Sequence, residues 1–313
     1  MNIPKLPDIL EAAERIKSQI HRTPVLTCAG LDEESGAQMY LKCENFQKTG
    51  SFKFRGASNA VKCLKTDEAA RGVSTHSSGN HGAALACAAA IRGIPAHIVV
   101  PENAAQPKQE SILRYGGQIT HCAPTLEARE TTLAEVVQKT GAVVIPPYND
   151  FNIISGQGTA AFELLEEIEN LDALIAPVGG GGLLSGTAIC AKALRPEIKI
   201  WGAEPEQADD AKQSLDAGKI IPANPNTIAD GLQTSLGPLT FEIIRNHVED
   251  ILTVSEAEII QAMRTIWERT KIIIEPSAAV SVAALLRYPK KFIGQKVGII
   301  LTGGNLDLDR LPF

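Results

Sequence analysis

The sequence lacks any long apolar run: its 313 residues contain no stretch of about 18 consecutive apolar side chains, which a membrane-spanning helix requires. It also lacks a block of basic residues. With 30 Lys and Arg against 36 Asp and Glu, the net charge is −6, which argues against a protein that binds nucleic acid through phosphates. Residues 1–17 alternate charged and apolar side chains as an amphipathic helix does, unlike a signal peptide. We therefore expect a cytoplasmic protein that binds a small molecule and neither a membrane nor nucleic acid.

Patterned cysteines are missing as well, because the chain has no CxxC pair and no Cys/His spacing typical of a zinc site. No internal repeat or low-complexity segment occurs. At roughly 150 residues per domain, the length predicts two domains. We interpret the six cysteines as reduced and mostly buried thiols: Cys28, Cys43, Cys63, Cys87, Cys122 and Cys190.

Short apolar runs alternate with longer stretches of helical character along the chain. Because these runs are apolar on both sides, they predict strands of parallel sheets covered by helices, an α/β fold. Strands are expected at residues 39–42, 72–75, 96–100, 118–121, 143–145, 173–176, 199–203 and 297–301, and helices at 79–92, 125–140, 156–167, 183–194 and 255–270. Ligands of open parallel sheets bind beyond the carboxyl ends of the strands, so residues that follow strands are the candidate site residues.

The first such segment places Lys53 between two phenylalanines, Phe52 and Phe54, at the predicted start of a helix with Ser51 as its N-cap. The helix dipole and the apolar neighbours both lower the pKa of an amine in this position and favour the neutral nucleophile that imine formation requires. The alternative is a lysine whose ammonium group reaches solvent, which is far more frequent. Spacing alone favours that alternative.

A second segment is a run of four glycines between a predicted strand and a predicted helix. Consecutive glycines let backbone N–H groups converge on an anion at a helix N-terminus, which predicts a phosphate site. A Walker A loop is excluded because Leu183 follows the run, and a dinucleotide fingerprint fails because Leu184 or Ser185 stands where its last glycine is needed. Glu204, about twenty residues further on, imitates a ribose-binding acid, so an NAD-dependent oxidoreductase stays open as an alternative. The four glycines are Gly179, Gly180, Gly181 and Gly182.

Three further segments carry polar groups after strands. Residues 75–82 place hydroxyl, amide and imidazole groups at a predicted helix start, where they either cap the helix or hold a ligand. His76 and His81 fit structural histidines better than bases. Thr302 follows the last strand. The acidic residues 204–210 suit Mg²⁺ or Ca²⁺, although an acidic loop is usually only solvated.

In combination and order, these segments resemble the fold type II pyridoxal-phosphate enzymes, and within them the serine racemase and threonine/serine dehydratase family. The likeness spans essentially the whole chain: residues 45–56, Ser-Ser-Gly-Asn-His at 77–81, Gly-Gln-Gly-Thr at 156–159, the glycine run, Glu275-Pro276 and Thr-Gly-Gly-Asn at 302–305. It implies an architecture similar to tryptophan synthase β, with a large cofactor-binding lobe (1–68 and 151–313) and a small mobile lobe (73–146) that closes over the substrate. A homodimer is implied by the same analogy.

The resemblance also implies roles for single residues toward pyridoxal 5'-phosphate. Lys53 would bind the cofactor covalently and Gly179 to Gly182, with Leu183, would hold its phosphate. Asn80 would bond the ring hydroxyl, Phe52 would pack beside the ring, Thr302 would face the pyridine nitrogen, and Glu275 belongs to the same set. A neutral hydroxyl at the pyridine nitrogen weakens the electron sink and favours prompt loss of a β-leaving group.

The chemistry implied is β-elimination from a 3-hydroxy amino acid such as L-serine, L-threonine or 3-hydroxyaspartate, giving a 2-oxo acid and ammonia. Lys53 would remove the Cα proton. Ser78 stands where serine racemases carry the base of the opposite face, so interconversion of L- and D-serine is the alternative. Both activities can coexist in one site.

Other implied sites lie around this centre. The substrate would contact Ser77, Ser78, His81, Arg129, Glu130, Gly231 and Thr234. Glu204, Asp210 and the carbonyl of Ala208 match a divalent-cation site for Mg²⁺, or for Ca²⁺ or Mn²⁺. Lys48 and Thr49 match a nucleotide-contacting stretch, so ATP is a candidate effector.

Two departures bear on the choice of activity. Tyr148 stands where mammalian racemases have Asn, and Ala83 stands where many relatives carry Gln. Because Tyr148 changes the polarity of the pocket, elimination is favoured over racemisation. A non-catalytic amino-acid-binding relative is a third hypothesis, which the joint presence of Lys53, Ser78 and Thr302 disfavours.

Overall fold

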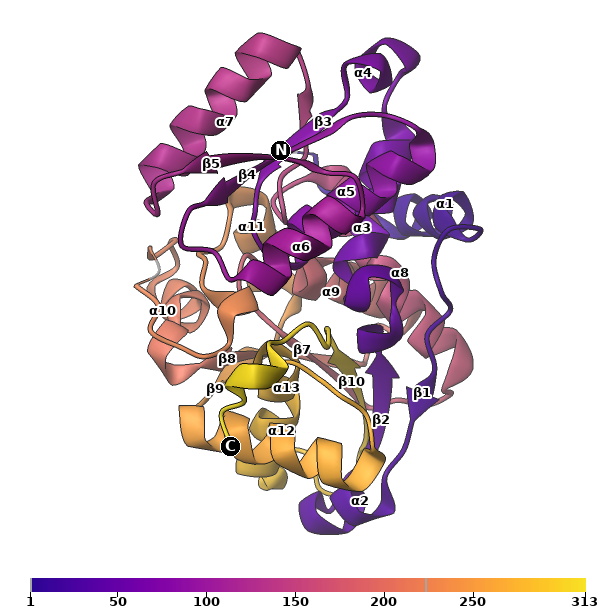
Figure 1. The fold of residues 1–313 in the computed structure, drawn as a ribbon. Helices are drawn as coiled ribbons and strands as arrows, with labels where there is room; N and C mark the ends of the chain where they lie inside the picture. Colours follow the sequence, from indigo (N-terminus) through magenta and orange to yellow (C-terminus); the bar gives the residue numbers. More distant parts are fainter. Residues whose placement is uncertain (1, 223) are drawn as a thin grey trace.

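Two sheets organise the chain, and the computed structural model describes residues 2–222 and 224–313. The larger sheet has the order β1 (Val25–Leu26), β2 (Gln38–Cys43), β10 (Lys296–Leu301), β7 (Ala173–Pro177), β8 (Lys199–Pro205) and β9 (Asp250–Val254). The smaller sheet has the order β5 (Gln118–Cys122), β4 (Ala96–Pro101), β3 (Val73–His76) and β6 (Val143–Val144). All pairs are parallel except β1 with β2. Two parallel sheets with flanking helices confirm the predicted α/β class (Figure 1).

The larger sheet is buried on both faces, which explains its apolar strands. In β10, Ile299 and Leu301 point into one apolar cluster and Ile300 into another. The first cluster is completed by α2 (Ala29–Ser35), α12 (Glu256–Thr270) and α13 (Pro276–Arg287). The second is completed by α1 (Leu6–Ile16), α8 (Phe151–Glu167), α9 (Gly182–Leu194), α10 (Asp210–Ala217) and α11 (Pro238–His247).

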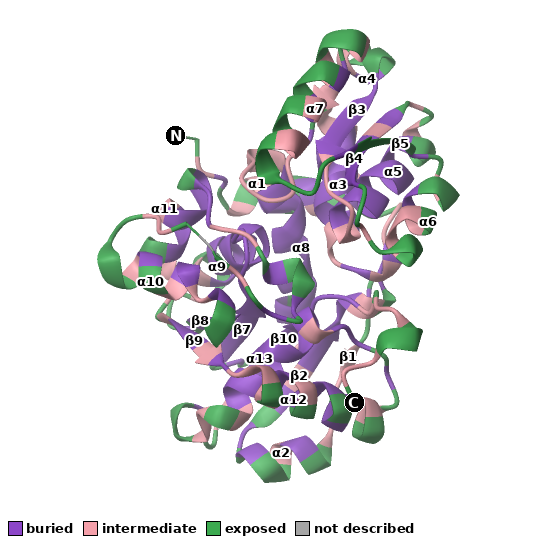
Figure 2. Cartoon of the chain, turned by 60° about the vertical axis from the view of Figure 1, so that its left-hand side comes forward, coloured by how far each residue is buried: buried purple, intermediate pink, exposed green. Residues whose placement is uncertain are grey.

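The smaller sheet is covered by α5 (Asn80–Arg92) and α7 (Leu126–Thr140), with α6 (Gln106–Arg114) packed on α5 and α4 (Thr66–Arg71) beside β6. The helix that begins at Lys53, α3 (Lys53–Cys63), packs on both α5 and α8. Phe54, Ala57 and Val61 of α3 share an apolar cluster with the smaller sheet. The lobe boundary at residue 68 stays a prediction. The cluster shows that α3 packs with the smaller sheet, and its contact with α8 brings it against a helix of the larger sheet. Figure 2 shows α8 buried between them.

The structure differs from the sequence predictions at two helix starts and at one strand. The helix predicted at 156–167 begins at Phe151, because Asp150 accepts a hydrogen bond from the Ile153 amide at 2.9 Å. The prediction of Ser51 as an N-cap was wrong: Phe52 occupies that position and Ser51 is extended, pairing with Gly303 in an isolated bridge. The strand β9 was not predicted.

All six cysteines are free, and four of them are buried, as predicted. Among the described residues, no helix is both long and apolar enough to span a bilayer.

Candidate active site

Lys53 is the first residue of α3 and lies where three separate segments meet. Its Nζ donates a hydrogen bond to the carbonyl of Pro147 at 2.9 Å. The amide of Phe52 donates to the carbonyl of Thr302 at 3.0 Å, and the Phe52 ring centroid lies 5.2 Å from the Lys53 Nζ. The start of α3 is therefore fixed between the end of β10 and the linker that precedes α8.

The environment of the Lys53 amine favours its neutral form. Burial lowers the pKa of Lys53 to about 8, and the charge of Glu275 offsets part of that shift. A lysine in water titrates near 10.4, so a far larger fraction of this amine is unprotonated at neutral pH. A neutral amine is both a nucleophile and a base, as the sequence analysis expected of this side chain.

The glycine run forms a tight turn into α9, and a bulkier residue would not fit. Gly181 has φ of +84° and is the N-cap of α9. A Cβ on Gly180 would lie 2.2 Å from the Tyr148 ring, and one on Gly179 would lie 2.9 Å from the Leu232 backbone. Such a cradle of small residues at a helix N-terminus suits an anion. Because Pro147 contacts Lys53 and Tyr148 contacts Gly180, one linker joins the amine to the glycine turn.

A buried polar cluster lies next to the turn after β10. Thr302 is 4% exposed, and its hydroxyl oxygen has no hydrogen-bond partner among the described residues. The side-chain amide of Asn80 donates through Nδ2 to both carboxyl oxygens of Glu275, at 2.9 and 3.1 Å. Its Oδ1 accepts a hydrogen bond from the Asn305 side chain at 2.9 Å. Burial, followed by the charge of Asp230, raises the pKa of Glu275 to about 8. The Thr302 hydroxyl is thus free to bind a ligand, while Asn80 and Glu275 hold each other.

The loop between β3 and α5 carries Ser77 and Ser78, both half-buried. His81, in the first turn of α5, is buried, and its Nε2 lies 3.0 Å from the Ile145 carbonyl. Burial, and then the charge of Lys53, lowers the pKa of His81 to about 3. Because the charge of Lys53 contributes to this shift, the His81 imidazole and the loop before it lie near the Lys53 amine.

The other predicted substrate residues lie in two places. Arg129 and Glu130, on α7, act on the pKa of His76, which burial lowers, so they lie near the carboxyl end of β3. The Gly231 amide donates to the Ser277 hydroxyl at 3.0 Å. The Thr234 hydroxyl lies 3.1 Å from the Tyr148 hydroxyl. Tyr148 therefore links Thr234 to the glycine turn.

The predicted metal ligands form a separate cluster between β8 and α10. Glu204 accepts hydrogen bonds from the amides of Ala211 and Lys212, whereas both carboxyl oxygens of Asp210 are buried without a partner among the described residues. Burial raises the pKa of both groups, that of Asp210 to about 7. Ala208 is buried beside them. The described residues contain no group of three or more His, Cys, Asp or Glu side chains suited to a metal, and the predicted set has two carboxylates and a carbonyl.

Sequence reasoning missed several contacts at the site. The Pro147 carbonyl and the ion pair between Lys108 and Asp230 join segments 94 and 122 residues apart. It also missed the buried ion pairs of Arg55 with Glu44 and Glu163. The only signal for Arg55 was its place two residues after the candidate lysine.

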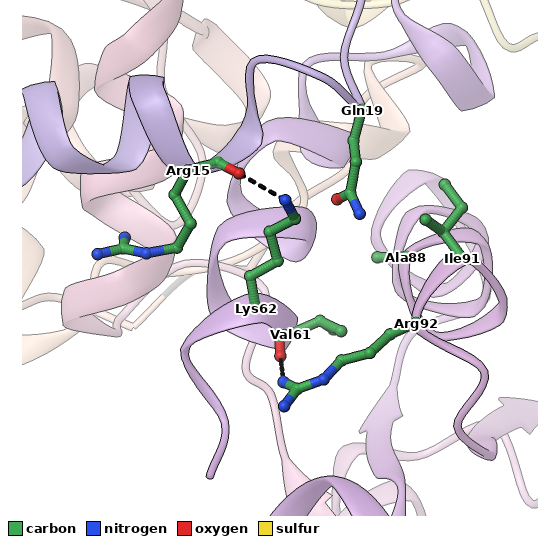
Figure 3. A pocket seen from close by; sticks show the side chains of 7 residues that line it. All are labelled: Arg15, Gln19, Val61, Lys62, Ala88, Ile91 and Arg92. Carbon is green, nitrogen blue, oxygen red and sulfur yellow. Dashed lines mark hydrogen bonds between the residues drawn. The ribbon is translucent and has the colours of Figure 1, made fainter. Parts of the chain in front are cut away.

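A surface cavity of about 500 Å³ is lined by Val61 and Lys62, near the C-terminal end of α3 (Figure 3). Two of its three basic groups bind backbone: Lys62 donates to the Arg15 carbonyl at 2.6 Å, and Arg92 donates to the carbonyls of Val61 and Leu64. The Arg15 guanidinium binds the side chains of Asn59 and Glu11. None of the predicted site residues lines it, so this cavity is not the candidate active site. Its lining residues are Arg15, Gln19, Val61, Lys62, Ala88, Ile91 and Arg92.

Comparisons with known proteins show the family of the chain. The sequence profile of the family described as "Pyridoxal-phosphate dependent enzyme" matches residues 16–303. The chain is 51% identical to beta-hydroxyaspartate dehydratase of Paracoccus denitrificans, over 100% of both chains. The crystal structure of serine racemase from Dictyostelium discoideum superimposes with a TM-score of 0.94 at 51% identity, covering 97% of this chain and 99% of that one. For the structure of maize serine racemase, the TM-score is 0.97 at 46% identity, with coverage of 98% and 95%.

Proposed function

Because the chain belongs to the family of pyridoxal-phosphate dependent enzymes, we propose that it catalyses β-elimination from a 3-hydroxy amino acid. Candidate substrates are L-serine, L-threonine and 3-hydroxyaspartate, and the products are a 2-oxo acid and ammonia. One observation carries the proposal: Pro147 accepts a hydrogen bond from the Lys53 amine while the next residue, Tyr148, packs on Gly180. Together, these two contacts join the Lys53 amine, the proposed nucleophile, to the glycine turn, the proposed anion site.

The residues present fit pyridoxal 5'-phosphate. The turn leaves no room for a Cβ at Gly179, Gly180 or Gly181, and the Thr302 hydroxyl is buried without a partner among the described residues. Lys53 would bind the cofactor covalently, Gly179 to Gly182 with Leu183 would hold its phosphate, and Thr302 would face the ring nitrogen. Asn80, Glu275 and Phe52 would complete the site. When bound, the cofactor supplies the electron sink that acidifies the Cα proton of the substrate.

Residues of the chain then have separate roles in the reaction. Lys53, whose pKa burial lowers to about 8, removes the Cα proton in its neutral form. The β-hydroxyl leaves as water, and a second water later releases ammonia, so the substrate is converted overall to a 2-oxo acid and ammonia. Thr302, a neutral group, would leave the ring nitrogen of a bound cofactor largely unprotonated, which would favour prompt loss of the leaving group.

We infer that substrate recognition uses the start of α5 and the loops that face it. Ser77, Ser78 and His81 would meet the α-carboxylate at the helix N-terminus, where the dipole favours an anion. Arg129 and Glu130 would lie at the mouth of the site, with Gly231 and Thr234 in its wall. The small lobe, residues 73–146, would close over the bound substrate.

Serine racemisation is the second candidate. It is favoured by the half-buried position of Ser78 in the loop before His81, which senses the charge of Lys53. Ser78 would return a proton to the face of Cα opposite Lys53 and so invert the carbon. The 51% identity with a serine racemase supports the same hypothesis.

We further propose that Glu204, Asp210 and the Ala208 carbonyl bind a divalent cation, Mg²⁺ or alternatively Ca²⁺ or Mn²⁺. The unpartnered carboxyl oxygens of Asp210, in the described part of the chain, support this proposal. ATP is proposed as an effector at Lys48 and Thr49, since the Thr49 hydroxyl is buried without a partner in residues 2–222 and 224–313. A cytoplasmic homodimer is part of the same hypothesis, and its mass in solution tests the assembly.

The test is to incubate the holoenzyme separately with L-serine, L-threonine and L-threo-3-hydroxyaspartate while measuring ammonia, 2-oxo acid and the D-isomer. Elimination predicts equal amounts of ammonia and 2-oxo acid. Absence of the 2-oxo acid would remove the dehydratase hypothesis, and absence of D-serine would remove the racemase hypothesis. Lys53→Ala should abolish turnover, and full turnover in that variant would overturn the assignment of Lys53.

A further inference from the structure

Arg55 lies two residues after Lys53 on α3 and is completely buried, with 0% of its surface exposed. Its Nε and Nη2 donate to the two oxygens of Glu44 at 2.7 and 2.8 Å. Its Nη1 and Nη2 donate to the two oxygens of Glu163 at 2.7 and 2.8 Å, and Nη1 also donates to Thr159 at 3.2 Å. Two carboxylates therefore bind one guanidinium from two sides.

A second cation completes this buried network. Lys42, also 0% exposed, donates to Glu163 and to the Thr23 carbonyl, each at 2.7 Å. The Thr23 hydroxyl donates to Glu44 at 2.6 Å. Two positive charges thus face two negative charges, and all of these contacts have hydrogen-bond geometry. The network connects β2, the turn after it, α3 and α8.

A network of this kind is a poor source of stability, because removing four charges from water costs about as much as their attraction returns. The network instead fixes how these elements are placed relative to one another, since bidentate bonds fix direction as well as distance. Fully satisfied buried polar networks specify one arrangement of the elements they join. The network therefore also fixes the position of the functional groups that these elements carry.

Next to Arg55, the helices α3 and α8 cross at close range. A Cβ on Gly156 would lie 2.7 Å from the Cα of Gly56, so the two backbones nearly touch. The Gly56 amide donates to Gln157 at 3.2 Å. The start of α8 follows the linker that provides the carbonyl partner of Lys53. Any slip of α3 along α8 would therefore move the Lys53 amine away from that linker.

We propose that Arg55, Glu44 and Glu163 are positioning residues, which lock the first turn of α3 onto α8 and so hold the Lys53 amine at Pro147 and the glycine turn. The proposal rests on the proposed function of Lys53 as the cofactor-binding residue. It assigns no contact with substrate or cofactor to Arg55 itself.

The decisive variant is Arg55→Lys, which keeps the charge but cannot make two bidentate pairs. Val61→Ala, in the same helix and in the apolar cluster of the smaller sheet, is the control for lost stability. We would measure the affinity of each apoprotein for pyridoxal phosphate, attachment at residue 53 by borohydride reduction and peptide mapping, kcat, KM and Tm. Glu163→Asp, which retains every charge and shortens one side chain of the network, is the second variant if Arg55→Lys does not fold.

A misplaced amine should lower kcat by about 100-fold with little change in KM. Cofactor affinity should fall in Arg55→Lys and stay at the wild-type value in Val61→Ala, even where the two variants lose the same Tm. Equal losses of affinity and kcat in variants of equal Tm would overturn the proposal, as would wild-type values in Arg55→Lys. If borohydride does not label Lys53 in the wild-type protein, the proposed function itself is wrong, which is a different result.

Discussion

Two clusters of buried charge differ in whether their charges are matched. Around Arg55, two cations and two carboxylates bind each other, and Arg55 and Lys42 hold the pKa of Glu163 below its ordinary value although burial alone would raise it. Around Asp210, carboxylates lie together without a cation on them in the described chain, and burial raises the pKa of both Glu204 and Asp210. The comparison shows that the first cluster balances its charges within the chain and that the second does not, which is why we propose a cation there.

Removing a cation from the matched cluster should have the largest effect. Arg55→Met leaves Glu44 and Glu163 buried, with Lys42, which pairs with Glu163, as the remaining cation of the network. We expect a loss of about 3–5 kcal/mol in the free energy of unfolding. Denaturant unfolding followed by circular dichroism measures it. A loss below about 1 kcal/mol, the value typical of an exposed pair, would show that the network is not desolvated.

Supplying a cation to the unmatched cluster should have the next largest effect. At a Mg²⁺ concentration 100 times the dissociation constant, one site adds about 2.7 kcal/mol to the free energy of unfolding. The gain should disappear on chelation with EDTA and should be absent in Asp210→Asn. An equal gain in that variant would place the bound cation elsewhere.

The amine next to the matched cluster gives a pH test. Because the pKa of Lys53 is lowered to about 8, the rate at which the apoprotein attaches pyridoxal phosphate should rise with pH up to about 8 and then level off. Below that value, the neutral fraction and the rate change about tenfold per pH unit. Stopped-flow absorbance measures the rate, and a continued rise to about pH 10 would show an ordinary, solvated lysine.

The smallest effect is expected at an exposed pair, which separates burial from charge alone. Arg264 and Glu268 pair at 2.8 Å on α12, with both side chains more than half exposed. Arg264→Ala should change the free energy of unfolding by no more than about 0.5 kcal/mol. A loss as large as that of Arg55→Met would mean that charge pairing, and not desolvation, determines these energies.

Residues close together in sequence made most of the fold and part of the site predictable. The α/β class follows from apolar strands that alternate with helices, and Ile299 and Ile300 do face opposite clusters. The glycine turn follows from four consecutive residues. The wrong N-cap at Ser51 shows the limit: Ser51 forms its isolated bridge with Gly303, at the far end of the chain, and no local pattern reports it.

The sequence by itself determined the chemistry that is available: a lysine between aromatic rings, a glycine run after a strand, and a threonine after the last strand. Only the tertiary structure decided that the pKa of the amine is lowered and that the amine is held, because desolvation and bidentate ion pairs depend on side chains brought together from distant segments. Glu163, 108 residues from Arg55, binds its guanidinium, and Pro147, 94 residues from Lys53, accepts a hydrogen bond from its amine. Electrostatic energies depend on distance and burial, and neither quantity can be read from spacing along a chain.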